Sequence, residues 1–201
     1  MWNERYQADD YVFGTEPNAF VRAMAERLVL SGRTLAIAEG EGRNAVFLAK
    51  QGHQVTTWDY AEAGLVKCRR LAAQHQVEVQ TQCVDLQVVD WAQEQGRWDQ
   101  VVCVFGHFPP DLRKKTLQGV KQAIRPGGYY ISEVYSTSQL AYGTGGPKDV
   151  ALLYRAQDLL DAFTDWHIIH FFVGEVYREE GTGHHGLSHV MQLLAQRKAM
   201  E

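Results

Sequence analysis

The sequence predicts a doubly wound α/β fold, in which a mostly parallel sheet carries helices on both faces. Short apolar runs alternate with helical patterns along nearly the whole chain. A glycine-rich turn at 39–45 follows a predicted strand and opens a predicted helix. The last two apolar runs, 166–177 and 187–196, are separated by a short Gly/His turn without a helix. That last pattern predicts one antiparallel hairpin at the end of an otherwise parallel sheet.

The first half of the chain supplies three predicted strands and the helices between them. Asn18 is a candidate cap for a helix that continues through about Leu30 and that Gly32 ends. The expected strands are 34–38, 54–58 and 77–84, the expected helices are 43–51 and 61–75, and a short helix or loop is expected at 86–94.

The second half continues the alternation. Strands are expected at 99–105 and 129–135, helices at 111–124 and 150–163, and a long mobile loop at the Gly- and Ser-rich segment 136–148. Neither a repeat nor a linker divides the chain, so residues 1–201 are expected to form a single domain. Residues 1–17 would be an N-terminal cap segment.

Composition limits the classes of partner. The formal net charge is −4, which gives no general attraction for nucleic acid or for an anionic membrane. No apolar run approaches the 18 or so residues of a membrane span, and the N-terminus is polar. The three cysteines form no C-x-x-C pair. A cytoplasmic monomer or homodimer without nucleic-acid or membrane partners is therefore expected.

The turn at 39–45 is the strongest local signal for a ligand. Gly40, Gly42 and Ala45 fit the G-x-G-x-x-G/A spacing, and such glycines allow positive φ and close approach of a ligand to the backbone. Asp59 ends the next strand, 19 residues beyond Gly40, where a carboxylate can accept hydrogen bonds from ribose hydroxyls. The alternative is a tight strand–helix turn, with Asp59 capping the following helix.

A third acid, Asp85, ends the third strand. It can accept from an adenine amine while Val84 or Leu86 packs on the ring, or it can form an Asx-turn; spacing alone leaves both open. Glu39, Asp59 and Asp85 would lie at the carboxyl edge of the sheet, where ligands of open α/β sheets bind. Because carboxylates repel a pyrophosphate, these acids favour a cationic amino-acid nucleoside over a dinucleotide.

At this point the chain resembles the class I S-adenosylmethionine-dependent methyltransferases. The resemblance rests on an ordered set of segments: LAIAEGEGRN (35–44), TTWDY (56–60), CVDL (83–86), WDQVVCVFGHF (98–108) and IRPGGYYISEVY (124–135). It implies a seven-stranded sheet of order 3-2-1-4-5-7-6, with strand 7 antiparallel. It also implies S-adenosyl-L-methionine as the cofactor.

A closer similarity is to small bacterial methyltransferases related to the tellurite-resistance and thiopurine enzymes. It rests on segments 2–20, 142–149 and 181–195. The cofactor contacts that the two resemblances imply are Glu39, Gly40, Gly42, Asp59, Tyr60, Asp85, Leu86 and Phe105. The segment after the fourth strand lacks the Asn/Asp-Pro-Pro pattern of enzymes that methylate amines of DNA bases or of glutamine. The expected acceptor is a small molecule, such as a thiol or an oxyanion of tellurium or selenium.

Three regions are candidates for the acceptor site. The N-terminal aromatic residues Trp2, Tyr6, Tyr11 and Phe13 either fold over the cofactor or staple the N-terminal segment to the core. The loop 136–148 is the second region. The third contains histidines: His107, His184 and His185 are the candidate catalytic residues, with turn or surface roles as the alternative.

Two further interpretations stay open from the sequence. The glycine turn and Asp59 also fit an NAD-dependent oxidoreductase, although no Tyr-x-x-x-Lys pair is present. The second interpretation is a non-catalytic protein that binds S-adenosylmethionine. No metal site is expected, because the histidines have no cysteine or carboxylate partners at ligand spacing.

Overall fold

The computed structural model describes residues 2–27, 31–181 and 184–199. These residues form a seven-stranded sheet of order β3-β2-β1-β4-β5-β7-β6. Strand β7 runs antiparallel to β5 and β6, and the other neighbours are parallel. The strands are β1 (Arg33–Ile37), β2 (Gln54–Asp59), β3 (Val79–Cys83), β4 (Trp98–Val104), β5 (Ile124–Tyr135), β6 (His167–Glu180) and β7 (His184–Gln196). The predicted fold class and strand order are confirmed.

The α-helices are α1 (Trp2–Arg5), α2 (Ala19–Arg27), α3 (Arg43–Lys50), α4 (Glu62–Gln74), α5 (Pro110–Ala123) and α6 (Ala156–Ala162). Asn18 caps α2 as predicted, because its Oδ1 accepts from the backbone N–H groups of Phe20 (3.0 Å) and Val21 (3.1 Å). The predicted end of this helix, at 28–30, lies outside the described residues. Within the described part of the chain, no helix has both the length and the apolar character that crossing a bilayer requires.

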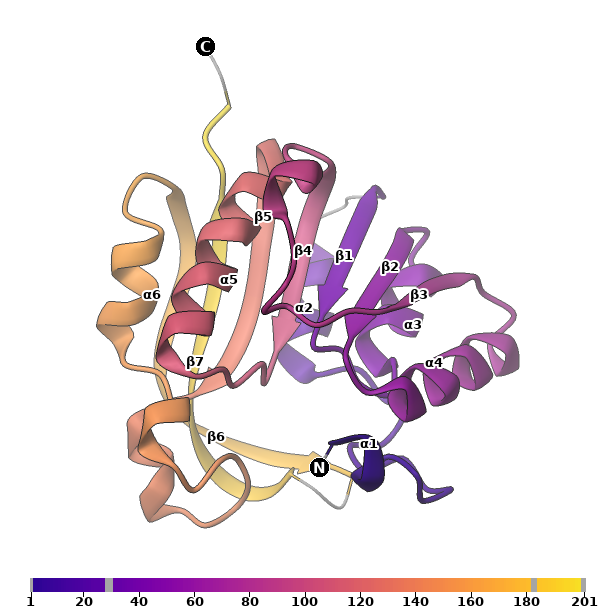
Figure 1. Ribbon diagram of the computed structural model, residues 1–201. Helices are drawn as coiled ribbons and strands as arrows, with labels where there is room; N and C mark the ends of the chain where they lie inside the picture. Colours follow the sequence, from indigo (N-terminus) through magenta and orange to yellow (C-terminus); the bar gives the residue numbers. More distant parts are fainter. Residues whose placement is uncertain (1, 28–30, 182–183, 200–201) are drawn as a thin grey trace.

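The helices cover both faces of the sheet, with α5 and α6 in front and α2 and α3 behind in Figure 1. Strand β1 shows how the sequence divides between the two cores. Leu35 and Ile37 join the core beneath α5 and α6, whereas Ala36 joins the core beneath α2 and α3. Burial of an aliphatic side chain such as Leu35 stabilises the fold by roughly 1.5–3 kcal/mol.

The predicted helix 150–163 is wrong at its start. The segment instead forms a short 3-10 helix, η3 (Val150–Leu152), and then α6, with an extended stretch between them. Tyr154 causes the break, because it forms an isolated parallel bridge with Ser136. The Tyr154 N–H donates to the Tyr135 carbonyl (3.1 Å), and its own carbonyl accepts from Thr137 N–H (3.0 Å). This long-range pairing overrides the helical pattern.

The final hairpin is longer than predicted. Strand β6 continues to Glu180 and β7 begins at His184, so that His184 pairs with Glu180 and His185 with Glu179. The two candidate histidines are therefore strand residues, and the prediction that they lie in a turn is wrong. In Figure 1 the far end of this hairpin curves beneath the carboxyl ends of the central strands, towards α1.

The segment 136–148, expected as a loop, contains the 3-10 helix η2 (Thr137–Ala141) and packs against β7. The Gln139 side chain is buried, and its Oε1 accepts from the His189 N–H (2.7 Å). Thr144 Oγ1 donates to the Leu187 carbonyl (2.7 Å). These contacts place the segment beside the far end of the hairpin.

Candidate functional site

The three predicted acids lie at the carboxyl ends of three adjacent parallel strands. Register pairs Ile37 with Trp58 and Asp59 with Cys83, so Glu39, Asp59 and Asp85 follow strands that end side by side. The structure therefore brings them to one edge of the sheet, as expected. Their immediate surroundings differ, and that difference decides what each can do.

Asp59 holds the glycine turn in place. Its Oδ2 accepts from the Gly40 N–H (2.8 Å), and its Oδ1 accepts from the Ala61 N–H (2.8 Å). The carboxylate is buried, and burial raises its pKa, whereas the two backbone donors act in the opposite direction. Asp59 thus joins the end of β2 to both the turn after β1 and the start of α4.

Glu39 caps helix α3. Its Oε1 accepts from the backbone N–H groups of Asn44 (2.8 Å) and Ala45 (2.9 Å), and its Oε2 accepts from Asn44 Nδ2 (3.3 Å). A carboxylate therefore already satisfies the positive end of this helix. A phosphate approaching the same helix end would lack those donors and would meet the negative charge of Glu39.

Both glycines of the turn have positive φ, and a side chain at each would meet a different neighbour. At Gly42 (φ +90°) an added Cβ would lie 2.3 Å from Cys68 Sγ, so this glycine allows α3 and α4 to pack closely. At Gly40 (φ +63°) an added Cβ would lie 2.6 Å from Tyr6 Oη. The open face of the turn at Gly40 is thus covered by a residue of the N-terminal segment.

The N-terminal segment lies across this edge of the sheet and is held by polar contacts. Lys67 Nζ donates to the Asp10 carbonyl (2.7 Å) and to Glu41 Oε1 (2.6 Å), and Glu41 Oε2 accepts from the Val12 N–H (2.8 Å). The Tyr6 hydroxyl is buried beside Asp59, and burial and that charge raise its pKa. The segment is thus stapled to α4, as one of the two sequence interpretations expects, and it also covers the glycine turn.

The remaining predicted cofactor residues at this edge differ in burial. Asp85 is exposed, and its Oδ1 accepts from the Gln87 N–H (2.8 Å), which is the Asx-turn alternative. Tyr60 is exposed, whereas Leu86 is buried in the core near Trp91. Tyr60 and Asp85 are therefore open to solvent at this edge, and Leu86 is not.

Backbone strain marks the point at which the strand order reverses. Ala38 (φ +52°) follows β1 and Phe105 (φ +54°) follows β4, and non-glycine residues rarely adopt this conformation. The crevice between such strands is the usual ligand position of an open α/β sheet. Phe105 stacks on Tyr135 (ring centroids 4.6 Å apart), and the Arg178 guanidinium lies 5.0 Å from the Phe105 ring.

His107 connects three elements and has neither ring nitrogen free. Its Nδ1 lies 3.0 Å from the Leu152 carbonyl, and its Nε2 accepts from the Tyr135 N–H (3.4 Å). This arrangement assigns the proton to Nδ1. Burial lowers the pKa of His107 to about 4, so the ring is neutral at pH 7. The geometry gives His107 a bridging position between β4, η3 and β5.

His184 and His185 face opposite surroundings although they are neighbours in β7. His184 is 4% exposed and contacts the rings of Phe13 (centroids 4.5 Å apart) and Phe105 (4.4 Å). His185 is exposed and lies beside Tyr177. The structure therefore brings only His184 of this pair to the end of β4.

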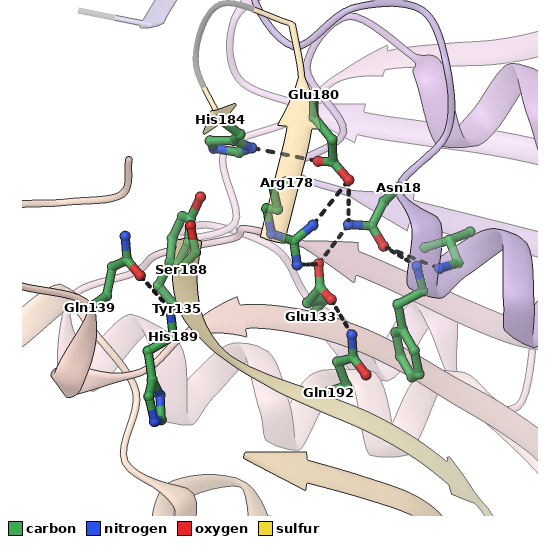
Figure 2. A network of polar contacts seen from close by, with 12 residues as sticks. Asn18, Glu133, Tyr135, Gln139, Arg178, Glu180, His184, Ser188, His189 and Gln192 are labelled. Atoms are coloured by element: carbon green, nitrogen blue, oxygen red, sulfur yellow. Dashed lines mark hydrogen bonds and ion pairs between the residues drawn. The ribbon is translucent and has the colours of Figure 1, made fainter. Parts of the chain in front are cut away.

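A buried polar network adjoins His184, and sequence reasoning missed it (Figure 2). Arg178 forms ion pairs with Glu133 and with Glu180 (3.0 Å). Asn18 Nδ2 donates to Glu133 Oε1 (2.6 Å) and Glu180 Oε1 (3.3 Å), and Arg43 pairs with Glu180 Oε2 (2.8 Å). One signal was available: Glu133 is a charged residue inside the apolar run 129–135.

No group of three or more His, Cys, Asp or Glu side chains within the described ranges could hold a metal ion. The three cysteines are all free thiols, and Cys83 is the exposed one.

Comparison with known proteins adds family information to this geometry. Residues 34–128 match the family model of a methyltransferase domain. A curated relative, the probable S-adenosyl-L-methionine-dependent methyltransferase TehB of Haemophilus influenzae, is 21% identical over 179 residues, which cover 87% of this chain. The matched region spans 60% of that relative's length.

Solved structures share the fold. The structure of TehB from Haemophilus influenzae has a TM-score of 0.72 at 19% identity and covers 98% of this chain and 66% of its own. A structure described as "Conversion of a Disulfide Bond into a Thioacetal Group during Echinomycin Biosynthesis" has a TM-score of 0.78 at 18% identity. The match covers 98% of this chain and 88% of that chain. Magnesium protoporphyrin IX methyltransferase from Synechocystis PCC 6803, with bound SAH, has a TM-score of 0.67 at 14% identity. The match covers 98% of this chain and 93% of that chain.

The domain match lies on the glycine turn, Asp59 and Asp85, and the strand order of the sheet agrees with that of the solved methyltransferases. The predicted resemblance is thereby confirmed: residues 34–128 match a methyltransferase domain, and the chain is similar to S-adenosylmethionine-dependent methyltransferases in sequence and fold.

Proposed function

We propose that this protein transfers a methyl group from S-adenosyl-L-methionine to a small-molecule acceptor. The observation that carries the proposal is the carboxylate of Glu39 at the N-terminus of α3, with Asp59 beside it. Glu39 occupies the N–H groups at the start of α3 that a phosphate would need, whereas the two carboxylates suit a cationic nucleoside. It favours S-adenosylmethionine over NAD, whose pyrophosphate would need the donors that Glu39 occupies.

The residues at this edge fit the nucleoside by the chemistry of their donors and acceptors. Asp59 would accept from the ribose hydroxyls, and the turn at Gly40 and Gly42 would lie along the amino-acid portion. Tyr60, Asp85 and Leu86 would form the adenine rim. When bound, S-adenosylmethionine supplies an electrophilic methyl group on a sulfonium sulfur. Glu39 would act through charge at short range, because its oxygens are engaged by α3.

The chain's own contribution is positioning and exclusion of water. Orientation of two reactants can contribute roughly 7–11 kcal/mol to the lowering of a barrier. The N-terminal segment covers the glycine turn through Tyr6, and Phe13 reaches His184 on the acceptor side. A dry, aromatic enclosure suits a soft, small nucleophile that must lose its water shell. We propose a thiol, or an oxyanion of tellurium or selenium, as the acceptor.

The cofactor assignment is tested by ligand-induced stabilisation. S-adenosylhomocysteine and NADH are compared in one thermal-shift experiment on the full chain. A ligand at 100 times its dissociation constant stabilises the fold by about 2.7 kcal/mol. We expect S-adenosylhomocysteine to raise Tm and NADH to leave it unchanged. Stabilisation by NADH alone, or by neither ligand, would refute the proposal.

Site assignment and turnover need separate measurements. Asp59→Asn should weaken S-adenosylhomocysteine binding by about tenfold or more, because each hydrogen bond to a charged group is worth about 1.5–3 kcal/mol. Asp90→Asn is the matched control, since Asp90 caps the 3-10 helix η1 (Trp91–Glu94) away from the edge.

Transfer of labelled methyl to a panel of thiols and oxyanions then separates an enzyme from a binding protein. Tight binding with no transfer across the panel would favour the binding protein.

A further inference from the structure

His184 differs from the other histidines near the end of β4 in having an unsatisfied buried nitrogen. His107 has both ring nitrogens engaged, and His189 has its Nδ1 2.7 Å from Ser136 Oγ. His185 is exposed on the other side of β7. His184 Nδ1 is buried without a hydrogen-bond partner and lies 3.7 Å from Glu180 Oε2. Among these four histidines, His184 alone is buried with an Nδ1 that has no hydrogen-bond partner and faces a carboxylate, and a proton held on Nδ1 leaves Nε2 able to accept one.

The carboxylate facing His184 is firmly anchored. Glu180 Oε2 pairs with Arg43 (2.8 Å), and Glu180 Oε1 pairs with Arg178 (3.0 Å) and accepts from Asn18 (3.3 Å). The histidine and the two guanidinium groups hold the pKa of Glu180 down to about 2. Glu180 therefore stays an anion at every pH at which the protein would work, with one oxygen directed at His184 (Figure 2).

The groups that face His184 come from five parts of the chain. Phe13 belongs to the N-terminal segment, Phe105 follows β4 and Tyr135 ends β5, and all three place aromatic rings against the imidazole. The charged groups nearby are Arg43, Arg178 and Glu180. Burial and the two cations lower the pKa of His184, whereas Glu180 raises it. The imidazole is therefore neutral at pH 7.

We propose that His184 accepts the acceptor's proton through Nε2, and that Glu180 is the positioning residue that holds the proton of the ring on Nδ1. The inference rests on the proposed function. The acceptor X–H gives its proton to Nε2, and the electron pair of X forms the new bond to the methyl carbon. The pair of the broken carbon–sulfur bond stays on sulfur, and the imidazolium then returns its proton to water. A base oriented by a carboxylate is a recurrent arrangement in nucleophile activation.

The first test is spectroscopic and needs neither cofactor nor turnover. Histidine ¹⁵N chemical shifts of the full chain report which nitrogen carries the proton. His184 is assigned by the loss of its signals in His184→Gln. We expect the Nδ1–H tautomer in the wild type and a shift towards Nε2–H in Glu180→Gln. An Nε2–H tautomer in the wild type would overturn the inference, because that nitrogen would then be unable to accept a proton.

The second test uses acceptor acidity. Methyl transfer is measured at pH 7 with an alkyl thiol of pKa about 8.5 and with an aryl thiol that is already ionised. His184→Gln should slow transfer to the alkyl thiol by about 100-fold or more and transfer to the aryl thiol by less than fivefold. His185→Gln, the matched control, should change neither rate. Equal losses with both thiols would show that His184 acts only through packing.

The outcomes separate the two proposals. If the wild type neither binds S-adenosylhomocysteine nor transfers methyl, the proposed function fails. If the wild type does both and His184→Gln transfers to the alkyl thiol at the wild-type rate, the base assignment alone fails. If the wild type binds without transferring to any thiol, the tautomer measurement still decides whether Glu180 positions the ring. S-adenosylhomocysteine affinity of His184→Gln should match that of the wild type within about twofold.

Discussion

The two halves of the sheet's carboxyl edge are built in different ways. At the ends of β1 and β2, carboxylates accept hydrogen bonds from backbone N–H groups that are close in sequence. Glu39 caps the helix that follows it, and Asp59 accepts from the N–H of Ala61. At the ends of β4 and β5, the polar contacts join side chains that are far apart in sequence. Asn18 and Glu133 are separated by 115 positions, and Arg43 and Glu180 by 137.

This difference teaches where each part of the function resides. A nucleoside shared by a whole family needs a fixed backbone cradle, and a short motif can specify it. The region proposed to hold the acceptor is enclosed instead by ion pairs that join α3, β5 and the final hairpin. Each of the following predictions breaks or sharpens that contrast, in order of decreasing effect.

The largest effect is expected at the ion pair between Glu133 and Arg178, whose side chains are 1% and 2% exposed. Glu133→Gln leaves a buried guanidinium with Glu180 as its remaining partner, and loss of one partner of a buried pair costs about 3–5 kcal/mol. Glu62→Gln breaks the exposed pair with Arg69 and should cost less than about 1 kcal/mol. Urea unfolding measures both; equal costs would mean that the network contributes no more than a surface pair.

On the other half of the edge, glycine substitutions separate packing from backbone strain. Gly42→Ala meets positive φ and a Cβ position 2.3 Å from Cys68 Sγ, so the free energy of unfolding should fall by about 3 kcal/mol. Gly52→Ala meets a similar φ (+92°) with no atom within 4 Å and should cost about 1 kcal/mol. If thermal unfolding gave the same loss for both, close packing of α3 on α4 would not be the reason for Gly42.

A pH effect is expected from His107. Its pKa falls from 6.5 in the unfolded chain to about 4 in the fold, so the unfolded state binds the proton more readily between these values. Stability from this group is complete above pH 6.5 and is lost as the pH falls towards 4. Allowing for partial exposure of the ring, the loss is about 2 kcal/mol. His107→Gln should have a flatter pH–stability curve over this interval, and parallel curves would contradict the hydrogen-bonded, neutral ring.

The smallest effect is expected at the proposed adenine contact. Asp85 is exposed and hydrogen-bonds its own turn, so Asp85→Asn should weaken S-adenosylhomocysteine binding by less than about fivefold, which corresponds to about 1 kcal/mol. Calorimetric titration compares it with Asp59→Asn. A larger loss at Asp85 than at Asp59 would reverse the assignment of the two carboxylates.

Much of the fold could be read from the sequence because its signals are local. The strand and helix alternation, the cap at Asn18 and the capping of α3 by Glu39 depend on residues within a few positions of each other. The prediction of a helix at 150–163 was wrong because the contact that breaks it is long-range. Tyr154 is drawn into an extended bridge by Ser136, which lies in another element, and no pattern within the segment contains that information.

The sequence by itself determined the succession of strands and helices along the chain, the position of the glycine turn and the arrival of three acids at one edge of the sheet; the order of the strands in the sheet was implied only by the family resemblance. It did so because side-chain periodicity and turn chemistry act over one or two turns of chain. Only the tertiary structure decided that Glu39 occupies the N-terminus of α3 and that His184 meets Glu180 among aromatic rings. Those facts depend on where a long hairpin and the N-terminal segment come to lie, and such contacts form only when distant parts of the chain pack together.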